Sequence, residues 1–487
     1  MDRGFILGFI LMIGFIVVIV ACGKSIKPSD ESRGPIILES KEESALYKDD
    51  NITEDDYGKS TNRMNNKKIK NKTNSSNINI YSLKDLIEYT LQHSPTLKSA
   101  HKQIDSSIYA EKQADKTFQL NPKIQGMVNV YRDSPSQIKG SSYEIMYMQP
   151  LEIGGQQEGR RTIGKYKRKL SEDKLFALRM QVLAKVKYLY YNGLVLKKKW
   201  ESINQVKSFY DKIVGVTREK RKERNISDPK ALIIDILYNR FMNEYDKVKE
   251  ELDNNLYDLK SEIYYEKSQS FDLKGKIFYD SLPYNIKELM KLAGNSRIEL
   301  LQRHNALNIK NGEIALEESK LFPQIDVFVR YKKEMKEQMY DIGVAFPLPI
   351  FNTNSNNVEA REKEKESIQI EIQAVTETVK RDILVALRKI RLALSKINRF
   401  ERSILKDSER SKLLIKEFYS MGGTEFITLL EQEKVYQEMI LSYWSAVQEY
   451  YFAFFLLEKA IGRVIFYSNR NEWESINFKT IYNKNYK

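Results

Sequence analysis

The pentapeptide LNPKI at residues 120–124 returns as LFPQI at residues 321–325. A second matching block follows each copy. Residues 143–153 contain YEI and then QPLEI, and residues 340–350 contain YDI and then FPLPI. Two blocks that recur in the same order at nearly the same spacing indicate an internal duplication.

The duplication defines two repeats, residues 81–282 and 283–462, which meet at the step from Leu282 to Pro283. The same order of elements is predicted in both: one helix, two strands and a long helical hairpin. The predicted helices span 83–118 and 286–321, the strands span 122–132, 142–151, 323–332 and 339–348, and the hairpins span 157–265 and 355–461.

The strands are predicted from alternation of apolar and polar residues. In the second repeat Ile325, Val327 and Val329 alternate with Asp326 and Arg330. Such a period of two gives a strand one apolar and one polar face. Strands of about ten residues are long enough to cross a membrane when tilted. A soluble hairpin with one buried face produces the same pattern, so both interpretations remain open at this point.

The hairpin helices show the four-three spacing of coiled coils instead. In the second repeat this spacing relates Ile383, Leu387, Ile390, Leu394 and Ile397. Each outgoing helix is predicted to run about 65 residues, or roughly 100 Å at 1.5 Å per residue. The predicted fold is therefore mainly α-helical, with a smaller β portion.

Four strands are too few to close a membrane barrel, because barrels begin at about eight strands. Unpaired strand edges are not tolerated in lipid. If the strands lie in a membrane, the chain must oligomerise. Three copies would supply twelve strands and pack their helices into a hollow cylinder, which is the form of a conduit.

The N-terminus predicts export and lipid attachment. Residues 4–21 are uncharged and mostly apolar, and Ala21 directly precedes Cys22, the one cysteine of the chain. This pattern is typical of a bacterial lipoprotein signal peptide at residues 1–21, with Cys22 as the acylated residue. An uncleaved anchor with an incidental cysteine is the alternative. Residues 22–80 are polar and predict a disordered tether. Residues 463–487 form a tail without a predicted role.

Composition argues against several other functions. The net charge of +14 is compatible with nucleic-acid binding, but Lys and Glu interleave along helical stretches and no recognition motif is present. One cysteine and three scattered histidines give no metal-site spacing. We find no phosphate loop and no nucleophile–base set. We therefore expect no enzyme activity, no cofactor, no metal site and no nucleic-acid partner.

The order of helix, Pro-led strand, second strand ending in QPLEIGG at residues 149–155, long helix, tip and return helix, repeated once, resembles the TolC family of outer-membrane efflux proteins. The likeness covers residues 81–462. The strand-to-helix passages at 149–155 and 346–352 most resemble the heavy-metal and cation efflux branch. The resemblance implies a homotrimer with a twelve-stranded barrel in the outer membrane and a helical tunnel in the periplasm. It also implies passive conduction, a periplasmic adaptor (membrane fusion protein) and an inner-membrane pump, for which the RND type is a candidate.

In this family the hairpin tips form the gate and dock the adaptor, so the resemblance also implies site residues. For docking they are Ser227, Asp228, Pro229, Gly422, Gly423 and Thr424, and for lining the gate Asp235, Thr428 and Glu431. The first tip lacks the usual glycine, and Ser227 or Asp228 is predicted to cap the returning helix. Thr428 and Glu431 stand where relatives have two acids, so only one charge is kept.

A lipid-anchored periplasmic coiled-coil scaffold or adaptor is the alternative function. It would share the anchor, the tether and the coiled-coil spacing. Adaptors place one helical hairpin between soluble β-domains, whereas here two hairpins each follow a strand pair of membrane length. This difference favours the channel.

Overall fold

The computed structural model describes residues 79–131, 140–266, 271–279, 281–322, 324–334 and 337–465. The chain divides into two units, and the second, Ser75–Lys487, contains every element described below. The predicted signal peptide, Cys22 and residues 466–487 of the tail lie outside the described residues. The predicted tether does so too, except that its last two residues belong to a strand, β1 (Asn79–Tyr81).

Four antiparallel strands form a sheet where the alternation predicts them. They are β2 (Lys123–Tyr131), β3 (Gly140–Leu151), β5 (Ile325–Glu334) and β6 (Glu337–Ala345). Their order is β2-β3-β5-β6, so one hairpin of each repeat joins the other through β3 and β5. The prediction for β6 ran three residues too far. Pro347 follows shortly, and a proline cannot donate to the ladder.

The helix predicted before each strand pair is two helices, so that prediction was wrong in both repeats. The pairs are α2 (Leu83–His93) with α3 (Pro95–Ala114), and α6 (Ile286–Ser296) with α7 (Ile298–Ser319). In the first break the Ser94 hydroxyl accepts a hydrogen bond from the backbone N–H of Leu97, and Pro95 starts the new helix. In the second, Arg297 is extended, with φ −71° and ψ 116°.

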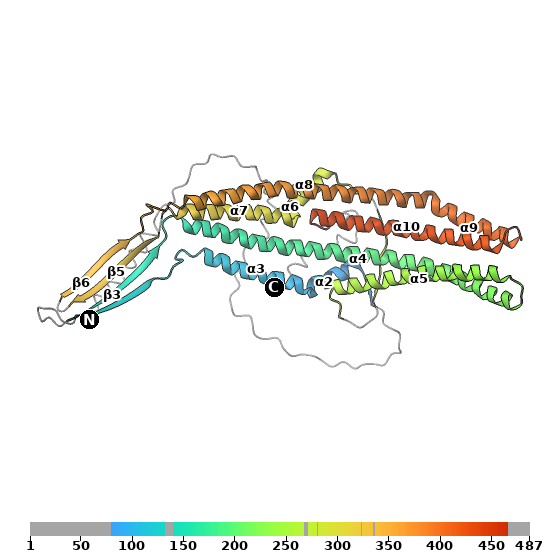
Figure 1. Cartoon of the computed structure of the whole chain (residues 1–487), viewed down its shortest axis with the longest axis horizontal. Helices are drawn as coiled ribbons and strands as arrows, with labels where there is room; N and C mark the ends of the chain where they lie inside the picture. Colours follow the sequence, from blue (N-terminus) through green and yellow to red (C-terminus); the bar gives the residue numbers. More distant parts are fainter. Residues whose placement is uncertain are drawn as a thin grey trace, which may run out of the picture. The chain divides into compact units, whose positions relative to one another are not determined.

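Long helices follow the strands (Figure 1). The first hairpin is α4 (Gln156–Lys222, 67 residues) and α5 (Asp228–Glu262). The second is α8 (Ser355–Arg399), a π-helical segment η2 (Phe400–Ile404), α9 (Leu405–Ser420) and α10 (Phe426–Ile461). The coiled-coil spacing predicts one uninterrupted outgoing helix in the second repeat. This prediction is wrong at η2. There, Glu401 accepts hydrogen bonds from Tyr279 and Tyr443, and the two phenol oxygens are 2.9 Å apart.

A second, two-stranded sheet was not predicted. β1 pairs in parallel with β4 (Phe271–Leu273). The Tyr81 ring stacks on Phe271 at 5.1 Å, and its hydroxyl shares a hydrogen bond with Tyr265. Burial, reinforced by that hydrogen bond, raises the pKa of Tyr81 to about 12. This cluster ties the start of the first repeat to its end.

The hairpin helices lie side by side in the order α5, α4, α10, α8, so α5 and α8 are the two outer helices (Figure 1). Their apolar stripes form the core, where Val186, Ile383 and Leu457 are fully buried. Along α4 most positions of the predicted four-three spacing are buried. Along α8 the buried series includes Ala386 and Ala393, and the predicted Leu387 and Leu394 beside them are half-buried. Among the described residues, no helix combines the length and the apolar character needed to cross a bilayer.

Candidate functional site

The strand register sorts the four-stranded sheet into two chemically different faces. Residues that pair across antiparallel strands share a face. On one face Val128 pairs with Tyr143, Ile145 with Tyr331, and Val329 with Ile342. We call this the apolar face. Gln149 and Lys333 also lie on it. Its apolar members are Ile124, Val128, Val130, Tyr143, Ile145, Tyr147, Leu151, Ile325, Val327, Val329, Tyr331, Tyr340, Ile342 and Val344.

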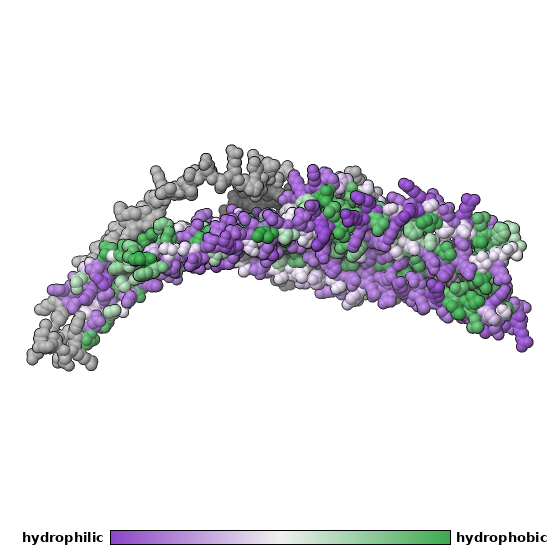
Figure 2. Space-filling model, turned by 45° about the horizontal axis from the view of Figure 1, so that its top comes forward, coloured by the Kyte–Doolittle hydropathy of each residue, from purple (hydrophilic) through white to green (hydrophobic). Residues whose placement is uncertain are grey.

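The apolar face is open to its surroundings. Ile124 is 78% exposed, Val128 71% and Ile342 65%. In Figure 2 hydrophobic surface gathers over the strand region as well as at the tip end of the helices. Contiguous exposed apolar surface of this kind marks contact with lipid or another protein. The soluble-hairpin interpretation requires that this face be buried, and within the described chain it is not.

The opposite face of the sheet carries charged and polar side chains together with apolar ones such as Met146 and Phe328. Arg330 lies 2.8 Å from Asp341 and 3.7 Å from Glu144, which binds β5 to both of its neighbours. Asn129 donates to the Ser142 hydroxyl at 3.3 Å. The sheet therefore separates apolar side chains on one face from ion pairs on the other. Because β2 and β6 each have one neighbour among the described strands, the sheet has two open edges.

The passage from β3 into α4 is held by close backbone contacts. The Gln156 side chain donates to the carbonyl oxygens of Ser319 and Phe322, at 3.2 and 2.9 Å. A Cβ on Gly154 would lie 2.4 Å from the Ser319 oxygen, so this position requires glycine. Arg160 makes a two-pronged ion pair with Glu152, both bonds 2.6 Å. The sheet and the first long helix are thus fixed to the second repeat.

The two tips have the same backbone geometry, although their sequences differ. After α4 the chain places Arg224 at φ 57°, and after α9 it places Gly422 at φ 75°. Asn225 N–H bonds the Lys220 oxygen, as Gly423 N–H bonds the Phe418 oxygen, both at 2.8 Å. This is the Schellman ending of a helix. The missing glycine at the first tip therefore leaves the turn unchanged.

Of the two residues predicted to cap the returning helix at the first tip, Ser227 stands at the cap position and Asp228 does not. Ser227 occupies the N-cap position of α5, but its side chain makes no capping hydrogen bond, and Asp228 is the first helical residue. Instead Asp228 pairs with Arg221 across the turn at 3.0 Å. Pro229 fits the first turn because its missing N–H is not needed there. Lys230 reaches Glu425 at 3.5 Å, which places the two tips next to each other.

The predicted gate residues differ in their exposure. Asp235 and Thr428 are half-buried and Glu431 is exposed. Within the described ranges none of the three side chains makes a hydrogen bond or an ion pair. Gly422 and Gly423 are exposed at the end of the second tip, and Thr424 beside them is half-buried.

Sequence reasoning missed the buried acid near this tip. Glu433 is 3% exposed and pairs with Lys412 at 2.9 Å. The Lys412 ammonium also lies 4.2 Å from the centre of the Tyr436 ring. Burial, with Glu433 and Glu438 nearby, raises the pKa of Tyr210 to about 12. No sequence pattern separates Glu433 from the exposed Glu431, because the two differ only in the direction their side chains take from α10.

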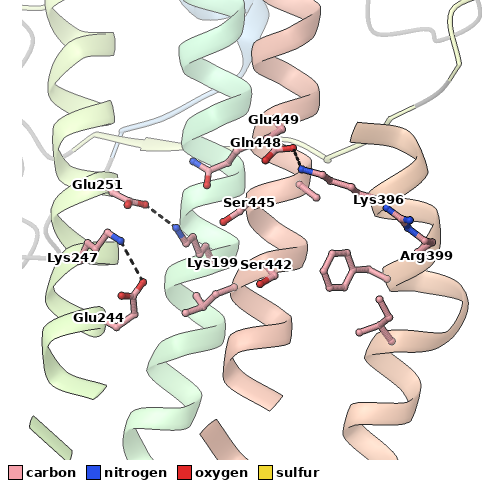
Figure 3. Close-up of a pocket in the computed structure, with 14 residues that line it drawn as sticks. Lys199, Glu244, Lys247, Glu251, Lys396, Arg399, Ser442, Ser445, Gln448 and Glu449 are labelled. Carbon is pink, nitrogen blue, oxygen red and sulfur yellow. Dashed lines mark hydrogen bonds and ion pairs between the residues drawn. The ribbon is translucent and has the colours of Figure 1, made fainter. Parts of the chain in front are cut away.

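A polar groove of about 730 Å³ crosses the four long helices (Figure 3). Three ion pairs lie along it: Lys199 with Glu251 at 2.8 Å, Lys396 with Glu449 at 2.6 Å, and Lys247 with Glu244 at 3.9 Å. One face of the helix layer is therefore lined by charged side chains. Residues 79–465, where described, contain no group of His, Cys, Asp and Glu suited to hold a metal ion.

Solved structures share this fold. The Campylobacter jejuni CmeC outer membrane channel matches with a TM-score of 0.64 and 18% identity, over 83% of this chain and 89% of that one. The Neisseria gonorrhoeae MtrE outer membrane channel matches at 0.63 and 16%, over 78% and 89%. CusC, described in connection with transmembrane channel formation, matches at 0.64 and 12%, over 78% and 92%.

No protein-family model and no curated protein sequence matches the chain. The described chain thus has the fold of outer-membrane channel subunits, and the mainly α-helical fold with a smaller β portion is confirmed for the single chain. The heavy-metal branch stays a prediction.

Proposed function

We propose that this protein is an outer-membrane channel subunit of a tripartite efflux system. One observation carries the proposal. A four-stranded sheet exposes a predominantly apolar face, carries charge on the other face and leaves both edges unpaired among the described strands. In lipid the apolar face is favourable, and the open edges must pair with further strands.

Three copies satisfy the edges with twelve strands, so the active form is a homotrimer. The long helices continue from the strands and extend into the periplasm as a tunnel. The likeness to outer-membrane channel structures supports this assembly. Substrate then passes without chemistry by this chain, delivered by an inner-membrane pump, with the RND type as the candidate, through a periplasmic adaptor.

The finer parts of the function rest on the family resemblance. We assign adaptor docking to the tips around Asp228 and Gly422, and gating to the helix starts behind them, at Asp235, Thr428 and Glu431. The resemblance to the heavy-metal and cation efflux branch makes metal cations one candidate substrate class, beside drugs and other compounds. Acylation of Cys22 would attach the mature chain to lipid.

A periplasmic scaffold is the competing function, and extraction from membranes separates the two. A channel stays in the membrane after Cys22→Ala removes the lipid, needs detergent for release, and runs as a trimer on gels unless heated. A scaffold is released as soon as the lipid is missing. In planar bilayers the purified trimer is expected to give discrete conductance steps. Their absence, with release of Cys22→Ala into the soluble fraction, would contradict the channel.

Docking at the second tip has its own test. Gly422→Val places a branched side chain at φ 75°, and Gly423→Val adds a Cβ 2.9 Å from the Phe418 ring. We expect both to abolish export while trimers still form. The same substitution at Gly126, where a Cβ meets nothing within 4 Å, is the control. Normal efflux in the tip variants would refute the assignment.

A further inference from the structure

The two outer helices carry opposite charge on the sides that face away from the molecule. Arg391 on α8 and Arg402 on η2, which continues α8, are both exposed, with Ser395 and Asn398 of α8 between them on the same side. Together with Arg399 and Leu394 they line a shallow hollow of about 370 Å³. We call Arg391, Arg399 and Arg402 the basic stripe. None of the three guanidinium groups makes an ion pair with a described residue.

The acidic stripe is on α5 and consists of Asp246, Glu250 and Asp253. Their spacing of four and three residues puts them on one side of the helix. All three are exposed, and none of them pairs with a cation within the described ranges. The core-facing residues Val248 and Asn255 are buried on the other side of α5. Asp235, eleven residues before Asp246, lies on the same side.

The two stripes lie at the same level along the helices. The groove in Figure 3 is lined by Glu244 and Glu251 of α5 and by Lys396 and Arg399 of α8, with α4 and α10 between them. The stripes occupy these same stretches of α5 and α8. Because α5 and α8 are the outer helices, the stripes are on opposite edges of one helix layer. They cannot meet within a single copy.

We infer that the acidic stripe of one copy pairs with the basic stripe of the next, and that this charge seam joins the helical part of the ring. The partner is a second copy of this chain, related by rotation. Such a head-to-tail contact uses two different surfaces and closes when the rotation fits. Opposed charges set the register and disfavour wrong partners. The inference rests on the proposed channel, because it takes neighbouring copies as the occupants.

The decisive experiment reverses charge on one stripe and then on both. Arg391→Glu and Asp253→Lys each place like charges across every interface of the ring. We expect each to weaken assembly about tenfold per interface, and the effect to shrink in high salt. The double variant restores opposite charges, so assembly should return toward that of the wild type. Substitutions that only disturbed the fold of each copy would not restore assembly when combined.

Two exposed residues near the stripes provide matched control substitutions. Lys389→Glu makes the same charge change two residues from Arg391, but about 160° around α8. Asp258→Lys makes the same change five residues from Asp253, about 140° around α5. Both control residues are exposed, and neither control should alter assembly.

Native mass spectrometry of the full chain in detergent measures the oligomeric state of each variant, and far-UV circular dichroism confirms that it is folded. A wild-type chain that stays monomeric overturns the proposed channel and the seam with it. A wild-type trimer that both stripe variants leave intact, or a double variant no better than the singles, overturns the seam alone.

Discussion

Lys187 and Glu458 form a buried ion pair in the helical core. The two charged groups are 2.6 Å apart, and their side chains are 8% and 1% exposed. Lys187 also donates to the Ile465 carbonyl oxygen at 2.8 Å, and Glu458 accepts from the Ile465 N–H at 2.8 Å. The Phe454 ring centre lies 4.5 Å from the ammonium. The pair therefore joins α4, α10 and the chain just beyond α10.

Removing one partner leaves the other charge buried, which typically costs about 3–5 kcal/mol. We expect Lys187→Met to lower the free energy of unfolding by that amount at pH 8. The double variant Lys187→Met/Glu458→Leu should recover most of the loss, because a buried pair replaced by apolar residues of similar size is often neutral or stabilising.

The pH dependence distinguishes this cause from lost packing. Burial raises the pKa of Glu458, and Lys187 opposes the rise. Lys187→Met removes the positive charge that opposes this rise. The folded-state pKa of Glu458 therefore rises further above its unfolded value of about 4.3. A carboxyl group with a raised folded pKa favours folding at low pH and loses that contribution as pH increases. The deficit of Lys187→Met should therefore be smaller at pH 5 than at pH 8.

Thermal unfolding of the purified full chain in detergent, followed by circular dichroism at one scan rate, measures these differences. Lys363→Met is the control. Lys363 pairs with Glu366 at 3.0 Å, but the side chains are 62% and 57% exposed, so no resolvable change is expected. The reasoning is refuted if Lys187→Met melts like the wild type, or if the double variant melts as low as the single one.

Three further outcomes follow from particular residues. Arg224→Gly should stabilise the chain by up to about 1 kcal/mol, seen as a higher melting temperature, because φ 57° suits glycine. Gly462→Ala should destabilise it by more than about 1 kcal/mol, since φ is 78° and the new Cβ would lie 2.6 Å from the Ser296 oxygen. Burial, then Arg179, lowers the pKa of His101; its contribution to stability is present above pH about 6.5 and is lost as pH falls through the folded-state value. His101→Gln should remove this part of the pH dependence of the melting temperature.

The sequence predicted the four-stranded sheet and the faces of its strands because a period of two survives in every strand. Val327 and Val329 could be assigned to one face before their neighbours were known. The register explains why: Val329 meets Ile342 and Tyr147, so apolar residues of three strands coincide. The long helices were predicted for the same reason, with a period near 3.5.

What could not be predicted depends on contacts between distant segments or on backbone detail. The strands β1 and β4 have three residues each and pair across 192 positions, as with Asn79 and Phe271. The π-helical segment at Phe400 has the same residue pattern as an α-helix. The turn at Arg224 takes a conformation that sequence reasoning assigns to glycine. The burial of the Glu433 side chain follows only from the way α10 packs against its neighbours.

The central claim is that the apolar face of the sheet lies in lipid while the polar face lines water. Cysteines placed singly at Val128 and Asn129, neighbours on opposite faces of β2, test it directly with a membrane-impermeant maleimide on protein in lipid vesicles. The unsubstituted chain serves as the blank for Cys22. We predict rapid labelling at position 129 and protection at position 128, with protection lost in denaturant. Equal labelling at both positions would contradict the channel.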